Sequence, residues 1–218
     1  MKTTTRLTGT FLVAGALCFW MSWLLMPEVG VTDAATILRL VSAQPERVLG
    51  SSVVQLLSAA LFALAVPGLV RQFPGDKNSW MRAGTALLGV GACGDAADAI
   101  YHQLAYEMAR PGIDQTAMLP VMRRMQTVDL KYLLPLILAF LLGCAALAIG
   151  AAREKIVPVA NPLFFALAIG AGIAGGILGE SIGVGARMVG LTCLGFLSAS
   201  LVWMGVAIWK SDWKQDQF

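Results

Sequence analysis

The sequence predicts an all-α integral membrane protein: a helical bundle of six transmembrane helices with two short amphipathic helices on its outer side. Of its 218 residues, 57% are hydrophobic and only 13% are charged, which is about half the charged share of a soluble domain. The charges also leave long uncharged stretches, and a helix needs about 20 apolar residues to cross the hydrocarbon core. A chain of this length is expected to form a single transmembrane domain, residues 1–218.

Five uncharged stretches have the length of a spanning helix: residues 7–27, 48–70, 132–152, 156–179 and 188–209. A sixth segment, residues 83–106, has helical length and apolar content but carries Asp95, Asp98 and His102. The first stretch follows two basic residues, as the core of a signal peptide would. It is longer than the roughly 7 to 15 residues of such a core, so we expect a retained helix.

The basic residues indicate which side of the membrane holds the termini, because short cytoplasmic loops are enriched in Lys and Arg. Six spans place both termini on one side. That side would carry nine of the sixteen basic residues, namely Lys2, Arg6, Arg71, Lys77, Arg82, Arg153, Lys155, Lys210 and Lys214. The other side would carry seven, namely Arg39, Arg47, Arg110, Arg123, Arg124, Lys131 and Arg187. We therefore expect a multi-pass inner-membrane protein with both termini cytoplasmic.

Two outer connections have the pattern of a capped amphipathic helix lying at the interface. Between the first two spans, Asp33 has the position of an N-cap before apolar residues at helical spacing, and Pro45 then begins the next helix. Between the third and fourth spans, Asp114 precedes three methionines at helical spacing, Met118, Met122 and Met125. These two segments are the short helices of the predicted fold.

The loops also suggest an internal repeat. Residues 9–12 (Gly-Thr-Phe-Leu) align with residues 84–87 (Gly-Thr-Ala-Leu), which places Cys18 over Cys93. The repeated unit would be a span, an outer helix and a second span, so helices one and two would correspond to helices three and four. Two such copies would enclose a site between them. The glycine-rich fifth span offers a contact face for a homodimer.

Asp95, Asp98, His102 and Tyr106 follow one another at i, i+3, i+7 and i+11, so they share one side of the third span. An ionisable residue near the middle of a span costs about 2.5 to 3.5 kcal/mol on insertion scales. The stripe must therefore face the interior of the bundle or water. We expect an outward-facing pocket in which Asp95, Asp98, His102 and Tyr106 bind a ligand, with Glu180 opposite His102 at its mouth.

This pocket predicts a protein that binds a small or amphiphilic ligand and couples binding to protonation of an aspartate or His102, in transport or in sensing. A second hypothesis is an intramembrane acid–base enzyme acting on a lipid or isoprenoid, with Asp95, Asp98 and His102 as its catalytic candidates. A third is a non-catalytic subunit of a larger membrane complex. We expect no metal site, because the chain has one histidine. The sequence indicates no particular cofactor.

The charged residues also bear on the expected partners and on a structural alternative for the aspartates. A net charge of +3, scattered along the chain, excludes a nucleic-acid-binding face, whereas membrane lipids are expected partners. The aspartates could instead be structural, bonded to neighbouring helices or paired with an outer arginine. Carboxyl groups covered by a neighbouring helix, with no cavity beside them, would contradict a pocket. Residues from elsewhere that could meet the stripe are Glu28, Arg47, Gln55, Arg110, Arg123, Asp129, Lys131, Glu180 and Arg187.

Overall fold

The computed structural model describes residues 2–27, 29, 31, 33–73, 78–178 and 185–214. Within these ranges the regular structure is entirely α-helical and no strand occurs, so the predicted all-α class is confirmed. The helices of the described part are α1 (Lys2–Leu25), α2 (Ala34–Ala43), α3 (Pro45–Gln72), α4 (Ser79–Met108), α5 (Gln115–Arg153), α6 (Ala160–Leu178) and α7 (Ala186–Lys214).

Four helices contain segments long and apolar enough to cross a membrane: Thr5–Leu25, Pro45–Gln72, Lys131–Arg153 and Ala186–Lys210. They match four of the predicted spans and support the prediction of a membrane protein. The other two predicted spans overlap α4 and α6. α4 has 30 residues but contains two aspartates, and α6 has 19 residues, with an apolar segment that includes Ala160–Ala174.

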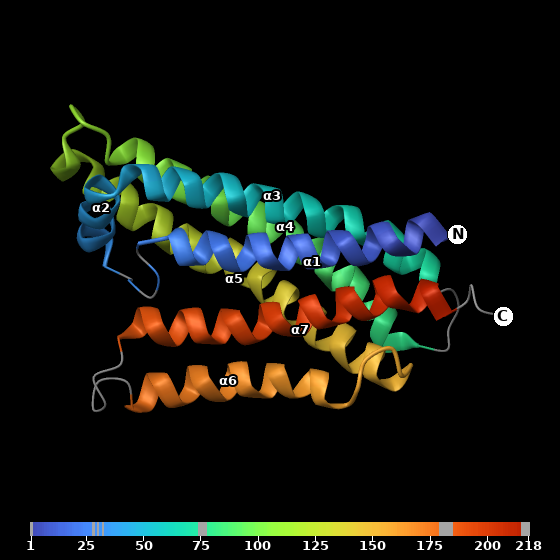
Figure 1. The fold of residues 1–218 in the computed structure, drawn as a ribbon. Coiled ribbons are helices and arrows are strands. Elements are labelled where there is room, and N and C mark those ends of the chain that lie inside the picture. The colour runs from blue at the N-terminus through green and yellow to red at the C-terminus, as the bar shows by residue number, and fades with distance from the viewer. Residues whose placement is uncertain are drawn as a thin grey trace.

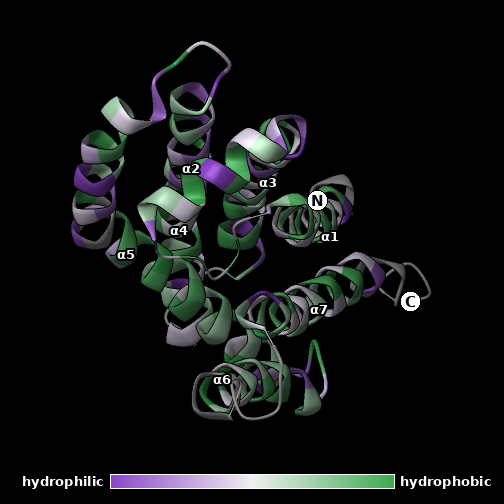
Figure 2. Cartoon of the chain, turned by 90° about the vertical axis from the view of Figure 1, so that its left-hand side faces the viewer, coloured by the Kyte–Doolittle hydropathy of each residue, from purple (hydrophilic) through white to green (hydrophobic). Residues whose placement is uncertain are grey.

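The six long helices form a curved row in the order α5, α4, α3, α1, α7 and α6 (Figures 1 and 2). Each helix packs mainly against the next one in this row, and α5 also touches α6 and α7. The short α2 lies across one end of the bundle (Figure 1), where it contacts α3, α4 and α5. This end is called the α2 end below.

The sequence around α2 produces a capped amphipathic helix, as predicted. The Oδ2 atom of Asp33 accepts a hydrogen bond from the backbone N–H of Thr36 at 2.8 Å. Hydrogen bonds from the side chain and the backbone of Thr36 hold the pKa of Asp33 below its ordinary value. The helix ends where Gln44 leaves the helical region, at φ −139° and ψ 54°, and Pro45 then begins α3.

The second predicted outer helix is not a separate element, which corrects that part of the fold prediction. It continues directly into the following span, and together they form the 39-residue helix α5. Asp114 caps its start as expected, accepting from the backbone N–H of Thr116 at 2.9 Å. Residues 126–131 contain neither proline nor glycine. No residue therefore interrupts the helix there. Between α2 and α3, in contrast, the non-helical residue Gln44 before Pro45 separates the two helices.

Glycines allow α4 and α5 to approach closely. A Cβ atom on Gly84 would lie 2.6 Å from the backbone nitrogen of Leu147, and one on Gly91 would overlap the backbone of Phe140. Side chains at these two positions would force the helices apart. The glycines thus set the spacing of the α4–α5 pair, which positions the site described below.

The buried core is divided along the bundle axis into two apolar clusters. One is centred on Phe19, Phe62 and Phe140, whose ring centroids are 5.0 to 6.5 Å apart. The other lies at the α2 end and includes residues of α2 together with Met26, Met108 and Met122. Buried polar residues of α1, α3 and α4 lie between the two clusters.

Candidate functional site

The polar layer is the set of buried polar side chains between the two apolar clusters. Its members belong to α1, α3 and α4 and are each at most 7% exposed; they are Ser22, Ser51, Ser52, Gln55, Ser58, Asp95, Asp98 and His102. Along each helix they fall between residues of one cluster and residues of the other. The predicted stripe therefore faces the interior of the bundle near the middle of α4.

Gln55 of α3 joins the two aspartates of α4. Its Nε2 atom lies 3.1 Å from Oδ1 of Asp95 and 2.7 Å from Oδ2 of Asp98. A primary amide has two N–H groups, so one side chain donates to both carboxyl groups. Of the partners considered from the sequence, Gln55 is the one that the structure brings to the aspartates. A neighbouring helix thus covers the carboxyl groups on this side.

His102 extends the layer toward the α2 end. Its Nε2 atom lies 3.4 Å from Oδ2 of Asp98, one helical turn earlier. The imidazole also packs between two aromatic rings, at centroid distances of 5.9 Å to Trp23 of α1 and 5.4 Å to Tyr101 of α4. Both ring pairs meet edge to face, so the position of the imidazole depends on α1 as well as on α4.

Two buried polar atoms in this region have no hydrogen-bond partner within the described part of the chain: Oδ2 of Asp95 and Nε1 of Trp23. Ser58 lies beside the Asp95 carboxyl, but its hydroxyl donates to the carbonyl oxygen of Gly15 at 3.1 Å. Oδ2 of Asp95 and the neighbouring Nε1 of Trp23 are thus an acceptor and a donor that could form further hydrogen bonds. Such groups are costly to bury.

Serines of the layer fasten α3 to α1. The hydroxyl of Ser51 donates to the carbonyl oxygen of Ser22 at 2.6 Å, and Ser58 bonds Gly15 seven residues earlier on α1. These bonds cross the helix interface within the same stretch of α3 that holds Gln55. The position of the Gln55 amide thus depends on the contacts of α3 with α1 as well as on its own bonds to α4.

Three of the arginines predicted to lie on the outer side are engaged elsewhere. Arg187 donates to the carbonyl oxygens of Leu24 and Met26, and Arg47 also donates to Leu24, so both satisfy the carbonyls at the end of α1. Arg110 pairs with Glu107 at 2.9 Å. In the described ranges no lysine or arginine forms a salt bridge with Asp95 or Asp98. Pairing with an outer arginine therefore does not account for the aspartates.

The other predicted site residues are placed differently. Tyr106 packs against the apolar cluster at the α2 end and is not a member of the polar layer. Glu180 and Glu28 lie outside the described residues, as does the side chain of Asp129. The structure thus brings Asp95, Asp98 and His102 together, while Tyr106 contributes to the cover above them.

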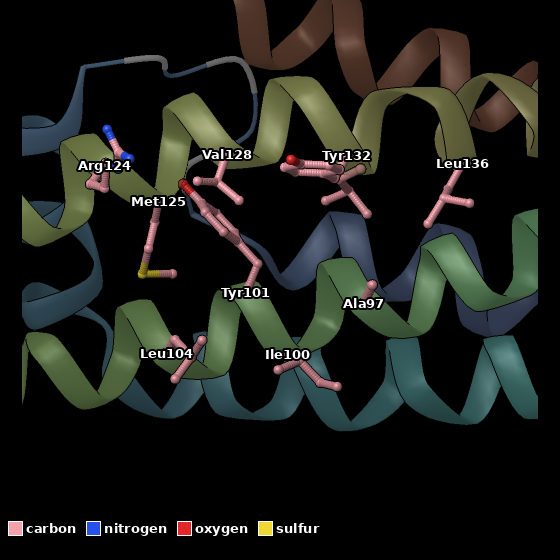
Figure 3. A pocket seen from close by; sticks show the side chains of 10 residues that line it. Ala97, Ile100, Tyr101, Leu104, Arg124, Met125, Val128, Tyr132 and Leu136 are labelled. Atoms are coloured by element: carbon pink, nitrogen blue, oxygen red, sulfur yellow. The ribbon is translucent and has the colours of Figure 1, made fainter.

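A groove of about 360 Å³ lies between α4 and α5 (Figure 3). Its lining is apolar apart from two tyrosines and Arg124. A second groove, of about 310 Å³, lies between α1 and α7. Neither of these grooves is lined by Asp95, Asp98, His102 or Tyr106. The predicted pocket with the acidic stripe in its wall is thus not one of the two.

Tyr101 connects the α4–α5 groove to the polar layer. It lines the groove (Figure 3). Its ring also contacts the imidazole of His102, at a centroid distance of 5.4 Å. A molecule in the groove would contact Tyr101, and the ring of Tyr101 also contacts His102. Tyr101 and His102 therefore connect the groove to Asp98.

No metal site is apparent in the residues that the structure describes, since no three His, Cys, Asp or Glu side chains gather there. Comparison with known protein families, with curated proteins and with solved structures finds no match for this chain. The site must therefore be interpreted from its own geometry.

Sequence reasoning missed two parts of the site. Gln55 was considered, but the polar stripe that it forms on α3 with Ser51 and Ser58, at i, i+4 and i+7, was not recognised. Tyr101 precedes His102 directly, so it lies off the acidic stripe. Only the packing of α4 against α5 gives it a role.

Proposed function

We propose that this protein is a multi-pass inner-membrane protein that binds a small amphiphilic molecule in the α4–α5 groove. Binding is coupled to a proton held by Asp95, Asp98 and His102, and it serves transport or sensing of that molecule. The ligand lies against Tyr101 rather than against the aspartates. The proposal thus moves the ligand from the acidic stripe to the neighbouring groove.

The proposal takes α4 and α6 as spans, which makes six. α4 has 30 residues, about 45 Å at 1.5 Å per residue, whereas the hydrocarbon core is about 30 Å thick. Its acids are buried in the bundle and do not face lipid. With six spans and the bias of the basic residues, both termini are cytoplasmic and the α2 end faces outward.

The proposed repeat is supported by two helical hairpins. α3 packs against α1 and α5 packs against α4. In each hairpin a glycine lies three residues before the arginine near its end, Gly68 before Arg71 and Gly150 before Arg153. A Cβ on either glycine would collide with the first helix of its hairpin. Equivalent close approaches at equivalent positions favour a duplicated unit.

The charges of the polar layer support the proposal that Asp95, Asp98 and His102 hold a proton. Two like charges 4 Å apart repel by about 4 kcal/mol at an effective dielectric constant of 20, and burying each charge adds a desolvation cost. One amide donates to both carboxyl groups, and a single proton on the pair would remove one charge. The ionisable groups around the pair are His102 and Tyr101 of α4 and the Cys144 thiol of α5.

The observation that carries the proposal is the double contact of Tyr101. Its ring forms part of the groove wall and packs on His102. A molecule that displaces this ring changes the surroundings of the imidazole and, through the 3.4 Å contact, of Asp98. Occupation of the groove and protonation of the layer are coupled in this way.

The test is photolabelling in lipid nanodiscs that contain a phosphatidylcholine with a diazirine in one acyl chain. Mass spectrometry then maps the labelled residues. We expect labels to concentrate on the groove and to fall severalfold in Leu104→Trp, which fills the groove. The matched control is Leu167→Trp on α6, because the two leucines are 49% and 52% exposed.

Proton coupling is tested by repeating the labelling between about pH 5 and pH 8, where a histidine changes charge. Labelling of the groove should change across this range in the parent protein. It should be constant in a variant carrying Asp95→Asn, Asp98→Asn and His102→Gln. Equal labelling of Leu104→Trp and Leu167→Trp would refute the groove, and an unchanged pH profile in the triple variant would refute the coupling.

The contact between Asp98 and His102 favours the acid–base enzyme as the second candidate, because it places a carboxyl beside an imidazole behind a lipid-accessible groove. Lipid extracted from the same nanodiscs decides between the two. A chemically altered lipid that forms with the parent and not with His102→Ala would establish the enzyme. An intact lipid supports binding.

A further inference from the structure

We infer that the ligand of the α4–α5 groove is an anionic phospholipid whose headgroup is bound by Arg124. This inference rests on the proposed function and names the chemical class of its ligand. It is carried by the direction of the groove and by the charges at one of its ends.

The groove has a polar end and an apolar length (Figure 3). Arg124 lies at the end nearer α2, and Leu136 lies at the other. Leu136 follows Arg124 by twelve residues of α5, which corresponds to about 18 Å along the helix. On the opposite wall, α4 contributes residues from Leu104 to Ala97, which cover about 10 Å of that length.

This direction matches that of a lipid. Arg124 stands in the first turns of α5, close to the membrane surface in the proposed topology, while the apolar end points toward the middle of the bilayer. A headgroup at the arginine would leave an acyl chain lying along the groove. The side chains along this length are those that contact a hydrocarbon chain, including Ile100, Leu104 and Val128.

Positive charge is in excess around the polar end. Arg124 is exposed and forms no salt bridge in the part of the chain that the structure describes. A further positive charge, Lys131, follows Arg124 by seven residues along α5, with its Nζ atom 5.6 Å from the ring centroid of Tyr132, which also lines the groove. Arg123, in contrast, does not line the groove, and its charge helps to lower the pKa of Asp33.

The described acidic residues of this end are already engaged. Glu107 pairs with Arg110 at 2.9 Å, Asp114 caps α5 and Asp33 caps α2. A zwitterionic headgroup would bring its own cation to a surface that is already positive. An anionic phosphodiester brings only negative charge, and its oxygens fit the paired N–H groups of a guanidinium.

The experiment is native mass spectrometry of the purified protein with equal amounts of phosphatidylglycerol and phosphatidylcholine that carry the same acyl chains. We expect the parent to retain more phosphatidylglycerol. Arg124→Gln should lower this preference about fivefold, the factor that one basic side chain contributes near an anionic surface. Arg123→Gln removes the same charge from the adjacent position and should keep the preference.

The headgroup assignment fails if the parent has no preference, or if Arg123→Gln lowers it as much as Arg124→Gln. Leu104→Trp separates this failure from a failure of the proposed function. If Leu104→Trp abolishes retention of both lipids while Arg124→Gln leaves the preference intact, the groove binds lipid without the arginine. If Leu104→Trp leaves retention unchanged, the groove is not the ligand site and both proposals fail. Equal melting temperatures of the variants exclude misfolding as the cause.

Discussion

Gln55→Leu removes the one side chain that donates to both aspartates while keeping a buried side chain of similar size. Gln55 is 1% exposed, so its amide is buried together with the carboxyl groups that it contacts. Its two contacts, 3.1 Å to Asp95 and 2.7 Å to Asp98, are both lost in the variant. Each carboxyl group is then buried without this donor.

The expected cost follows from those two groups. A buried polar group that loses its hydrogen-bond partner costs about 1 to 3 kcal/mol. The free energy of unfolding should therefore fall by about 2 to 6 kcal/mol in Gln55→Leu. Ser52→Ala is the matched control: Ser52 is equally buried on α3, but its hydroxyl bonds only Val48 of its own helix, at 2.9 Å. Its loss should cost at most about 1 kcal/mol.

Unfolding in mild detergent, followed by circular dichroism with increasing denaturant, measures both variants. A Gln55→Leu protein as stable as Ser52→Ala would refute the bridging role of the amide. Replacing both aspartates by leucine in the Gln55→Leu background should recover stability, because an apolar layer has no unpaired groups to bury. Failure of that recovery would mean that the destabilisation came from packing.

Three further predictions concern the scaffold. Gly91→Leu should separate α4 from α5 and cost about 1 to 3 kcal/mol or more, whereas Gly170→Leu, with open space around it, should change the thermal midpoint little. Because the pKa of Asp33 is lowered in the folded state, its contribution to α2 is present at neutral pH. It is lost as pH falls below about 3.9, the ordinary value of an aspartate, and through the lower folded pKa. Hydrogen exchange of the α2 amides, corrected for intrinsic rates, should show this loss in the parent and not in Asp33→Asn, which keeps a capping oxygen. Arg187→Gln removes the donor to Leu24 and Met26 and should cost about 1 to 3 kcal/mol in the same unfolding assay; no change would exclude a capping role at the end of α1.

The sequence was sufficient to predict the helical class, four of the apolar spans, the capped α2 and the interior position of Asp95, Asp98 and His102. These features depend on composition and on spacing within one helix. Asp95, Asp98 and His102 are too costly to expose to lipid, so their side of α4 had to face inward whatever packed against it. The same logic applied to Ser51, Gln55 and Ser58 would have predicted the α3 face that meets them.

The groove could not be predicted, because the apolar side chains that line it have the same composition as those that face lipid. Leu104 and Leu167 are equally apolar and equally exposed, yet one lies in the groove and the other on the surface of α6. The distinction depends on how α4 and α5 diverge toward the α2 end. The continuity of α5 was missed for a related reason: the turn expected after Met125 had no residue that required it.

The proton of the polar layer is tested most directly by infrared spectroscopy of the protein in nanodiscs at neutral pH. A protonated carboxyl group has a carbonyl stretching band that an ionised one lacks. The account predicts such a band in the parent, a shift of that band when phosphatidylglycerol is added, and its loss when Asp95 and Asp98 are both replaced by asparagine. A parent spectrum without the band, or a band that the lipid leaves unchanged, would contradict it.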